Sequence, residues 1–270
     1  YNLYEEASTP WKWHEDLFKL AKEIDITIFS SPFDKSAVDF LEILGAPAYK
    51  IASPEIVDIP LIEYVASTGK PIIMSTGMAN IEEIRDAVCA AQKAGCEQLS
   101  ILHCVSAYPA PAKDINLSNI RELARKFDLV TGLSDHTLGV AIPIAAVSVG
   151  ASIIEKHFTL SRATGGVDSA FSLEPEELEL LVKSCKVAQE AIGEVNIGPK
   201  ESELKGLNYR RSLYVVKDIA AGDSLTPENI RAIRPGYGLK PKFYNEIIGK
   251  KAIRDIRRGT PVSWDLIGKV

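Results

Sequence analysis

The sequence holds 270 residues, of which 46% are hydrophobic and 25% are charged, with a formal net charge of −5. This length accommodates one large domain and a small one, or two medium domains, and the balance is typical of a globular protein. A negative net charge argues against nucleic acid as a partner. The longest apolar runs, such as 140–149, are too short to span a bilayer. With no secretory apolar segment visible, we expect a cytoplasmic protein without membrane contact.

An N-terminal loop and helix come first, and the helix has an apolar side of Trp11, Trp13, Leu17 and Leu20. After them, short apolar runs that end in polar clusters predict strands, and the segments between them predict helices. Such alternation is typical of a parallel sheet with right-handed crossovers. The strands are predicted at 26–33, 48–53, 71–77, 98–108, 129–136 and 152–158, and the helices at 35–44, 60–67, 81–94, 116–127, 140–149 and 175–192.

Polar residues at the predicted strand ends recur at fairly even intervals, and no GxGxxG turn accompanies them. This pattern favours a (β/α)8 barrel of the TIM type over a doubly wound sheet. Such a barrel has eight units, whereas only six are visible, and the first residue is Tyr rather than Met. We therefore expect the first units to be missing from this chain. The strand ends carry Ser31, Ser53, Ser75, Ser106, Ser134 and His157.

The texture of the sequence changes near residue 195, which predicts a domain boundary. We expect an N-terminally incomplete barrel in 1–194, a polar linker in 195–209 and a small β-rich domain in 210–270. Within the last part, the segments KDIAAG (217–222) and RDIRRG (254–259) look like two related strand–turn units.

Lys50 is the sharpest candidate for chemistry, because it interrupts an otherwise apolar strand. Side chains alternate along a strand, so Lys50 shares a face with Ala48 and Ala52 and is predicted to point into the barrel. A buried ammonium without a partner is costly. The residue therefore predicts binding of a phosphate or carboxylate, or a Schiff base with a carbonyl. A snorkelling lysine with a purely structural ion pair is the alternative.

Small hydroxyl side chains end several neighbouring strands. Hydroxyls and adjacent backbone N–H groups suit a bound phosphate, although each could be a turn residue on its own. Glu55 follows closely and could act on substrate hydroxyls or cap the next loop. The hydroxyls in question belong to Ser53, Ser75, Thr76 and Ser134.

His136 and His157 end adjacent strands, where two imidazoles can share a divalent cation with a carboxylate and water. A hydrogen-bonded pair that orients substrate is equally compatible with this placement. Asp168 lies in a glycine-rich loop that could cover the mouth of the barrel or form a plain turn. His103 lies earlier in its strand and is expected to be structural. The four cysteines show no metal-ligand spacing, which predicts buried free thiols.

The motifs together resemble the sialic acid synthase family, in collinear order and over essentially the whole chain. They are SSPF (30–33), YKIAS (49–53), STGM (75–78), GLSDHT (132–137) and EKHFT (155–159). The tail resembles the antifreeze-like (SAF) domain of that family, a β-clip fold. Four further segments look like the pseudaminic acid synthase branch: TPWKWHE (9–15), GGVDSAFS (165–172), RRSLY (210–214) and SWDLI (263–267).

The resemblance implies a transferase that joins phosphoenolpyruvate to 2,4-diacetamido-2,4,6-trideoxy-L-altropyranose, with water, to give pseudaminic acid and phosphate. It implies a divalent metal, Mn²⁺ or Mg²⁺, held by His136 and His157, with Lys50 and either Glu55 or Asp168 as catalytic groups. It further implies a swapped homodimer in which an arginine of one subunit enters the barrel of the other. Ser106 departs from the asparagine of the neuraminate branch. The positions implied to bind substrate are Ser31, Lys50, Ser53, Ser75, Ser106, Tyr108, Ser134, Asp168 and Arg234.

Other functions fit parts of the sequence. Within the family, N-acetylneuraminate or legionaminate synthesis is the alternative. A Schiff-base aldolase would use Lys50 covalently, and a non-catalytic sugar-binding protein would depend on the tail domain alone. A barrel does not by itself choose among these functions.

Overall fold

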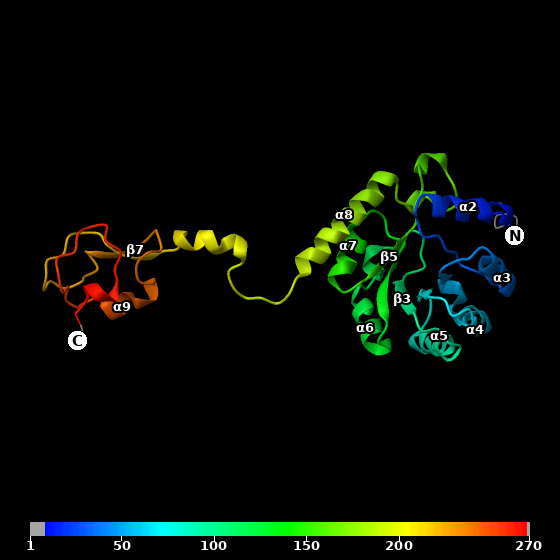
Figure 1. The fold of residues 1–270 in the computed structure, drawn as a ribbon, viewed down its shortest axis with the longest axis horizontal. Coiled ribbons are helices and arrows are strands. Elements are labelled where there is room, and N and C mark those ends of the chain that lie inside the picture. Colours follow the sequence, from blue (N-terminus) through cyan, green and yellow to red (C-terminus); the bar gives the residue numbers. More distant parts are fainter. Residues whose placement is uncertain (1–8, 269–270) are drawn as a thin grey trace. The chain divides into compact units, whose positions relative to one another are not determined.

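The computed structural model describes residues 9–268 of the chain. The chain divides into two compact units, Tyr1–Gly193 and Glu194–Val270. The first contains a curled parallel sheet with helices, and the second contains a small antiparallel sheet (Figure 1). Within the described residues, no helix is long and apolar enough to cross a membrane.

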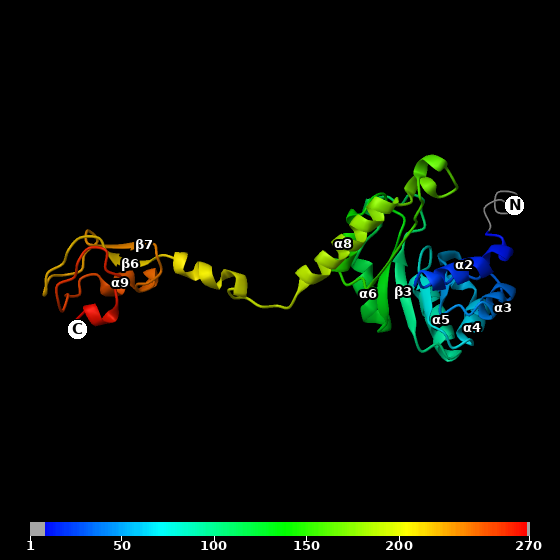
Figure 2. The same ribbon diagram turned by 45° about the horizontal axis from the view of Figure 1, so that its top comes forward.

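Five parallel strands form the sheet of the first unit, and they lie side by side in chain order. A helix follows each of them, and Figure 2 shows the helices along the outside of the curled sheet. This is the connectivity of a β/α barrel, so the predicted barrel-type fold is confirmed, here as a five-stranded half-barrel. The strands are β1 (Tyr49–Ile51), β2 (Ile72–Ser75), β3 (Leu99–Cys104), β4 (Val130–Asp135) and β5 (Ile153–Lys156).

Several helices of the first unit begin at polar caps and bury one face. Asp34 caps the helix after it by accepting from the Ala37 N–H at 2.9 Å, and Asn80 forms a capping box with Glu83. The outer face of the sheet supplies fully buried partners, among them Tyr49 and Ile101. The helices are α2 (Trp11–Glu23), α3 (Lys35–Ile43), α4 (Ile59–Ala66), α5 (Ile81–Lys93), α6 (Ser118–Phe127), α7 (Ala141–Ser148) and α8 (Pro175–Ile192).

At the start of the first unit, the predicted helix forms and the predicted strand does not. The predicted strand at 26–33 forms only a single bridge, from Ser30 to Tyr49, where the Lys50 N–H donates to the Ser30 carbonyl at 3.1 Å. The predicted apolar side of α2 lies in solvent, and Ala21 is its only buried residue. The apolar side chains of Trp11, Trp13, Leu17 and Leu20 are exposed by 53%, 54%, 40% and 51%.

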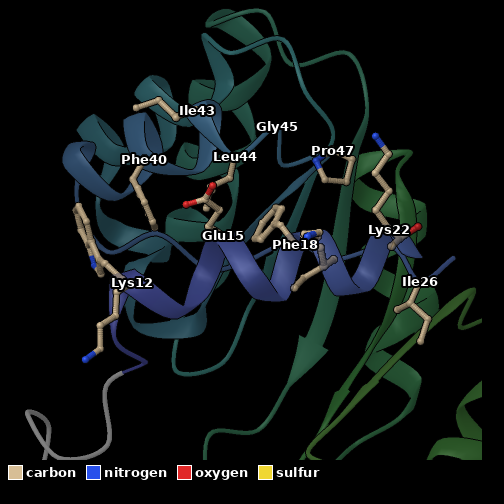
Figure 3. A pocket seen from close by; sticks show the side chains of 14 residues that line it. Lys12, Glu15, Phe18, Lys22, Ile26, Phe40, Ile43, Leu44, Gly45 and Pro47 are labelled. Atoms are coloured by element: carbon tan, nitrogen blue, oxygen red, sulfur yellow. The ribbon is translucent and has the colours of Figure 1, made fainter. Parts of the chain in front are cut away.

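A groove of about 1070 Å³ lies beside α2 and α3. Figure 3 shows Glu15 and Phe18 of α2 facing it, with Phe40 of α3 and Leu44, just after α3, on the other side. None of the candidate site residues lines this groove. Its place between helices also separates it from the strand ends, where a barrel carries its chemistry.

The second unit is built around β6 (Ser212–Val215), β7 (Ile230–Ile233) and the short helix α9 (Tyr244–Ile247). The two segments that look alike in the sequence pair with one another. Ile219 and Ile256 exchange backbone hydrogen bonds of 2.9 and 2.8 Å. Asp218 and Asp255 each accept from a backbone N–H of the opposite segment, at 2.6 and 2.8 Å. The internal similarity therefore corresponds to a local two-fold arrangement.

Candidate active site

Polar side chains gather on the inner face of the sheet, towards the carboxyl ends of the strands. Lys50 on β1 points to the same face as Ser75 on β2, because residues in register share a side and every second residue returns to it. Cys104, Ser134 and Glu155 are direct neighbours in register across β3, β4 and β5. The curl of the sheet turns this face inward, so residues far apart in sequence surround one space.

Lys50 is buried, with only 8% of its side chain exposed. Its ammonium donates to the Ile51 carbonyl at 3.1 Å and lies 3.6 Å from Glu155 Oε2. The other oxygen of Glu155 accepts from Ser134 Oγ at 2.5 Å. Burial lowers the pKa of Lys50, and the charge of Glu155 opposes that shift only in part. The ammonium is therefore poorly solvated and available to a stronger anion.

Two buried polar atoms near Lys50 have no hydrogen-bond partner among the described residues. They are Ser75 Oγ, in a residue only 1% exposed, and Glu55 Oε2. Burial also raises the pKa of Glu55. Buried polar atoms in proteins are nearly always paired, and each orphan costs about 1–3 kcal/mol. Such atoms beside a buried ammonium indicate a site that is completed by a ligand.

Gly77 shapes the wall between two of the hydroxyls. Its N–H donates to Ser53 Oγ at 3.0 Å, so Ser53 accepts this bond and its own proton points to another partner. A Cβ on Gly77 would lie 2.7 Å from Ser53 Oγ and even nearer to Ser106 Oγ. Ser106 Oγ lies 3.8 Å from Cys104 Sγ. The absence of a side chain at Gly77 therefore allows both hydroxyls their present positions.

His136 and His157 form an aromatic cluster at the mouth of this space. Their ring centroids are 5.2 Å apart, and Tyr108 lies 4.3 Å from His136. Asp168 Oδ2 is 3.6 Å from His157 Nδ1. The buried ring of Phe171 lies 5.0 Å from His157. The cluster offers ring nitrogens, a phenol and a carboxylate to the same opening.

The hydrogen bonds of His136 assign its ring nitrogens. Nδ1 is 2.9 Å from the Val105 carbonyl, and a carbonyl can only accept, so Nδ1 carries the proton and Nε2 keeps a lone pair. Burial lowers the pKa of His136, but its bonds to Cys104 and Val105 outweigh burial and raise it overall. Burial and the nearby charge of His136 lower the pKa of His157.

Comparison with known proteins shows which family the chain belongs to. Residues 1–196 match the NeuB family, and residues 210–268 match the SAF domain. The chain belongs to the NeuB family. The predicted resemblance to sialic acid synthases, with an antifreeze-like domain in the tail, is thus confirmed.

Relatives within and around the NeuB family carry specific names. A pseudaminic acid synthase of Helicobacter pylori is 46% identical over 267 residues, which cover 98% of this chain and 78% of that protein. An N,N'-diacetyllegionaminic acid synthase of Campylobacter jejuni is 40% identical over 249 residues, covering 91% and 75%. The crystal structure of N-acetylneuraminic acid synthetase from Leptospira borgpetersenii, in complex with citrate, is 37% identical with a TM-score of 0.72, and covers 77% and 73% of the two chains.

The imidazoles of this NeuB-family chain fit part of a metal shell. Two rings bound at about 2.1 Å to one ion have centroids about 5 Å apart, close to the 5.2 Å between His136 and His157. The Nδ1–H bond of His136 is the usual outer contact of a ligating histidine. Within residues 9–268, no group of three or more His, Cys, Asp or Glu side chains is arranged to hold a metal. Other ligands would have to complete the shell.

Other predicted residues have local surroundings of their own. Ser31 lines a hollow of about 350 Å³ with His14, Phe33 and Phe40. Arg234 belongs to the second unit, just after β7, and is exposed there. His103 points away from the site and bonds the Ile115 carbonyl at 2.5 Å, the structural role expected for it.

Three residues of the candidate site were not predicted from the sequence: Glu155, Cys104 and Gly77. Glu155 stands two positions before His157, a spacing that puts both on one face of the strand and could have identified it. Cys104 is a buried free thiol, as expected, but no part in the site was predicted for it. Burial raises its pKa, but hydrogen bonds to His136 and Ser53 outweigh burial and lower it overall. Another cysteine expected to be buried, Cys89, is exposed.

Proposed function

We propose that this chain condenses phosphoenolpyruvate with 2,4-diacetamido-2,4,6-trideoxy-L-altropyranose and water, giving pseudaminic acid and phosphate. The observation that carries the proposal is the buried ammonium of Lys50 beside the unpartnered hydroxyl of Ser75, in a chain 46% identical to a pseudaminic acid synthase. A ligand that carries both a phosphate and a carboxylate satisfies this arrangement.

The anionic groups of phosphoenolpyruvate would be held on the inner face of the sheet. Lys50 supplies the positive charge, and Ser53, whose oxygen accepts from the Gly77 N–H, would turn its proton towards the bound anion. These donors lie on the buried strand β1 and at the turn directly after it, so they need no reorganisation as charge develops. Much of the rate enhancement would then come from positioning. Further donors at the same strand ends are Ser75, Ser106 and Ser134.

The aldehyde of the open-chain sugar would lie beside the histidine cluster. Carbon 3 of phosphoenolpyruvate attacks it, water adds at carbon 2, and phosphate leaves from the tetrahedral intermediate. Tyr108 and Asp168 face this opening and would orient the sugar, and Asp168 or Glu55 would move the protons. A divalent ion, Mn²⁺ or Mg²⁺, held by His136 and His157 would polarise the aldehyde oxygen when bound.

We further propose that the protein works as a swapped homodimer. In that arrangement Arg234 of one subunit would reach the barrel of the other. The arginine is exposed on a turn that Ser212 holds in place, because the Ser212 hydroxyl donates to the Pro235 carbonyl at 2.7 Å. Contact with a second subunit gives a reason for this exposed position. Arg234→Ala should then impair turnover without altering the melting of the barrel, whereas unchanged kinetics would remove the arginine from the site. Because phosphoenolpyruvate is a cytoplasmic metabolite, we assign the protein to that compartment.

The direct test is phosphate release from phosphoenolpyruvate in the presence of alternative sugars. We expect turnover with 2,4-diacetamido-2,4,6-trideoxy-L-altropyranose to exceed turnover with N-acetylmannosamine and with the sugar used by legionaminic acid synthases. Faster release with either of the other two sugars would assign the chain to another activity of the same family.

A second experiment separates the synthase from the other classes. A Schiff-base aldolase would be trapped on Lys50 by borohydride with pyruvate, whereas the synthase should give no adduct. Lys50→Ala should abolish phosphate release. Retained sugar binding with no release from the wild-type protein would favour the non-catalytic alternative.

A further inference from the structure

Glu155 contacts two of the donors that the proposed function assigns to phosphoenolpyruvate, Lys50 and Ser134. One carboxylate oxygen lies 3.6 Å from the Lys50 ammonium, and the other accepts from Ser134 Oγ at 2.5 Å. Among the described residues, no other carboxylate lies within ion-pair distance of Lys50. The side chain therefore occupies the position of an anionic ligand.

We propose that Glu155 is an internal counter-ion, which holds Lys50 and Ser134 in the empty site, is displaced by phosphoenolpyruvate, and returns as phosphate leaves. This inference rests on the proposed function, because it takes the anion that binds Lys50 to be the substrate. It makes Glu155 a positioning residue, since it acts through Lys50 and Ser134.

The surroundings of Glu155 permit this exchange. Its side chain is 41% exposed, whereas that of Lys50 is 8% exposed, so the carboxylate can turn towards solvent while the ammonium stays in place. A phosphate at Lys50 would otherwise lie against a second anion in a poorly solvated space, where like charges repel strongly. The carboxylate and the substrate anion therefore exclude each other at Lys50.

The exchange has a use at both ends of the catalytic cycle. Before substrate binds, the carboxylate compensates a buried ammonium that would otherwise be costly to desolvate. After the reaction, phosphate is held by fewer groups than phosphoenolpyruvate, because the carboxylate of the substrate has become part of the product. Glu155 then competes with phosphate for Lys50 and speeds its release.

Glu155→Gln tests the proposal, because it removes the charge and keeps an oxygen that can accept from Ser134. Binding of inorganic phosphate and of phosphoenolpyruvate to the full chain is measured by titration calorimetry, with EDTA present to separate anion binding from metal. We expect both anions to bind about tenfold more tightly, equivalent to about 1.4 kcal/mol. Glu63→Gln, at an exposed position on α4, changes the net charge equally and should leave both affinities unchanged.

A gain in affinity cannot come from damage to the fold, which is why its direction is diagnostic. Affinity in Glu155→Gln that equals or falls below that of the wild type overturns the inference, as does an equal gain in Glu63→Gln. Glu155→Ala should also bind more tightly, and phosphate should inhibit turnover of both variants more strongly. If the wild type binds phosphate but releases none from phosphoenolpyruvate and sugar, the proposed function fails while the counter-ion exchange stands.

Discussion

Replacing Gly77 with alanine tests whether the hydroxyls around it are held in place for a ligand. The added methyl group would lie 2.7 Å from Ser53 Oγ and closer still to Ser106 Oγ, well inside van der Waals contact. Each hydroxyl ends a short side chain and can rotate away. The barrel should therefore still fold, at a cost of about 1–3 kcal/mol for local overpacking.

The larger effect is expected on binding. A hydrogen bond to a charged group contributes about 1.5–3 kcal/mol, and loss of one such bond corresponds to about a 10- to 100-fold change in affinity. We expect the KM for phosphoenolpyruvate in Gly77→Ala to rise within that range, while kcat falls less. The assay is phosphate release at saturating sugar over a series of phosphoenolpyruvate concentrations.

Two further variants make the result decisive. Gly206→Ala is the matched control, because a methyl group there meets open space and the backbone lies outside the left-handed region. Ser106→Gly in the Gly77→Ala background removes the nearest obstacle and should recover part of the lost affinity. A KM in Gly77→Ala equal to that of Gly206→Ala would refute the reasoning.

Three more predictions concern the ion pair on the outer face of the sheet, the pH dependence of stability and the metal requirement. Lys156→Met should lower the free energy of unfolding of the first unit by about 3–5 kcal/mol in urea, because it leaves Asp135 without its cation; the Asp135 side chain is fully buried and bonded to Lys156 at 2.6 Å. Adding Asp135→Leu to this variant should recover most of the lost stability. A small effect of Lys156→Met alone would contradict this reasoning. Burial raises the pKa of Glu55 in the folded protein. The contribution of this carboxyl to the free energy of unfolding is therefore fully present below its unfolded pKa of about 4.3, and it is lost as the pH rises through the folded-state pKa. Glu55→Gln should accordingly raise Tm by about 1–2 °C at pH 7.5, a small value because the residue is partly exposed, and should have no effect near pH 4; an equal shift at both pH values would speak against it. EDTA should abolish turnover and Mn²⁺ restore it, except in His136→Ala and His157→Ala, and full activity of the chelated enzyme would exclude the histidines from this role.

The order of the elements was readable from the sequence because it depends on local patterns. Apolar runs bounded by polar residues predicted every strand from β1 to β5, and caps such as Asn80 lie where the helices begin. The inward direction of Lys50 also follows from alternation along one strand. Family motifs are local strings, so the membership in the NeuB family was predicted as well.

The contacts within the site could not be read in this way. Glu155 lies more than a hundred positions from Lys50, and only the curl of the sheet brings their side chains within 3.6 Å. The need for glycine at position 77 depends on two serines from other strand ends. The exposure of Trp13 and Leu20 on α2 was also decided by what packs against the helix, which its own periodicity does not report. Periodicity and capping act over a few residues, so the sequence determined the elements and their faces. Distances between elements follow from how the whole sheet curls and packs, so the tertiary structure alone decided which charges and hydroxyls meet.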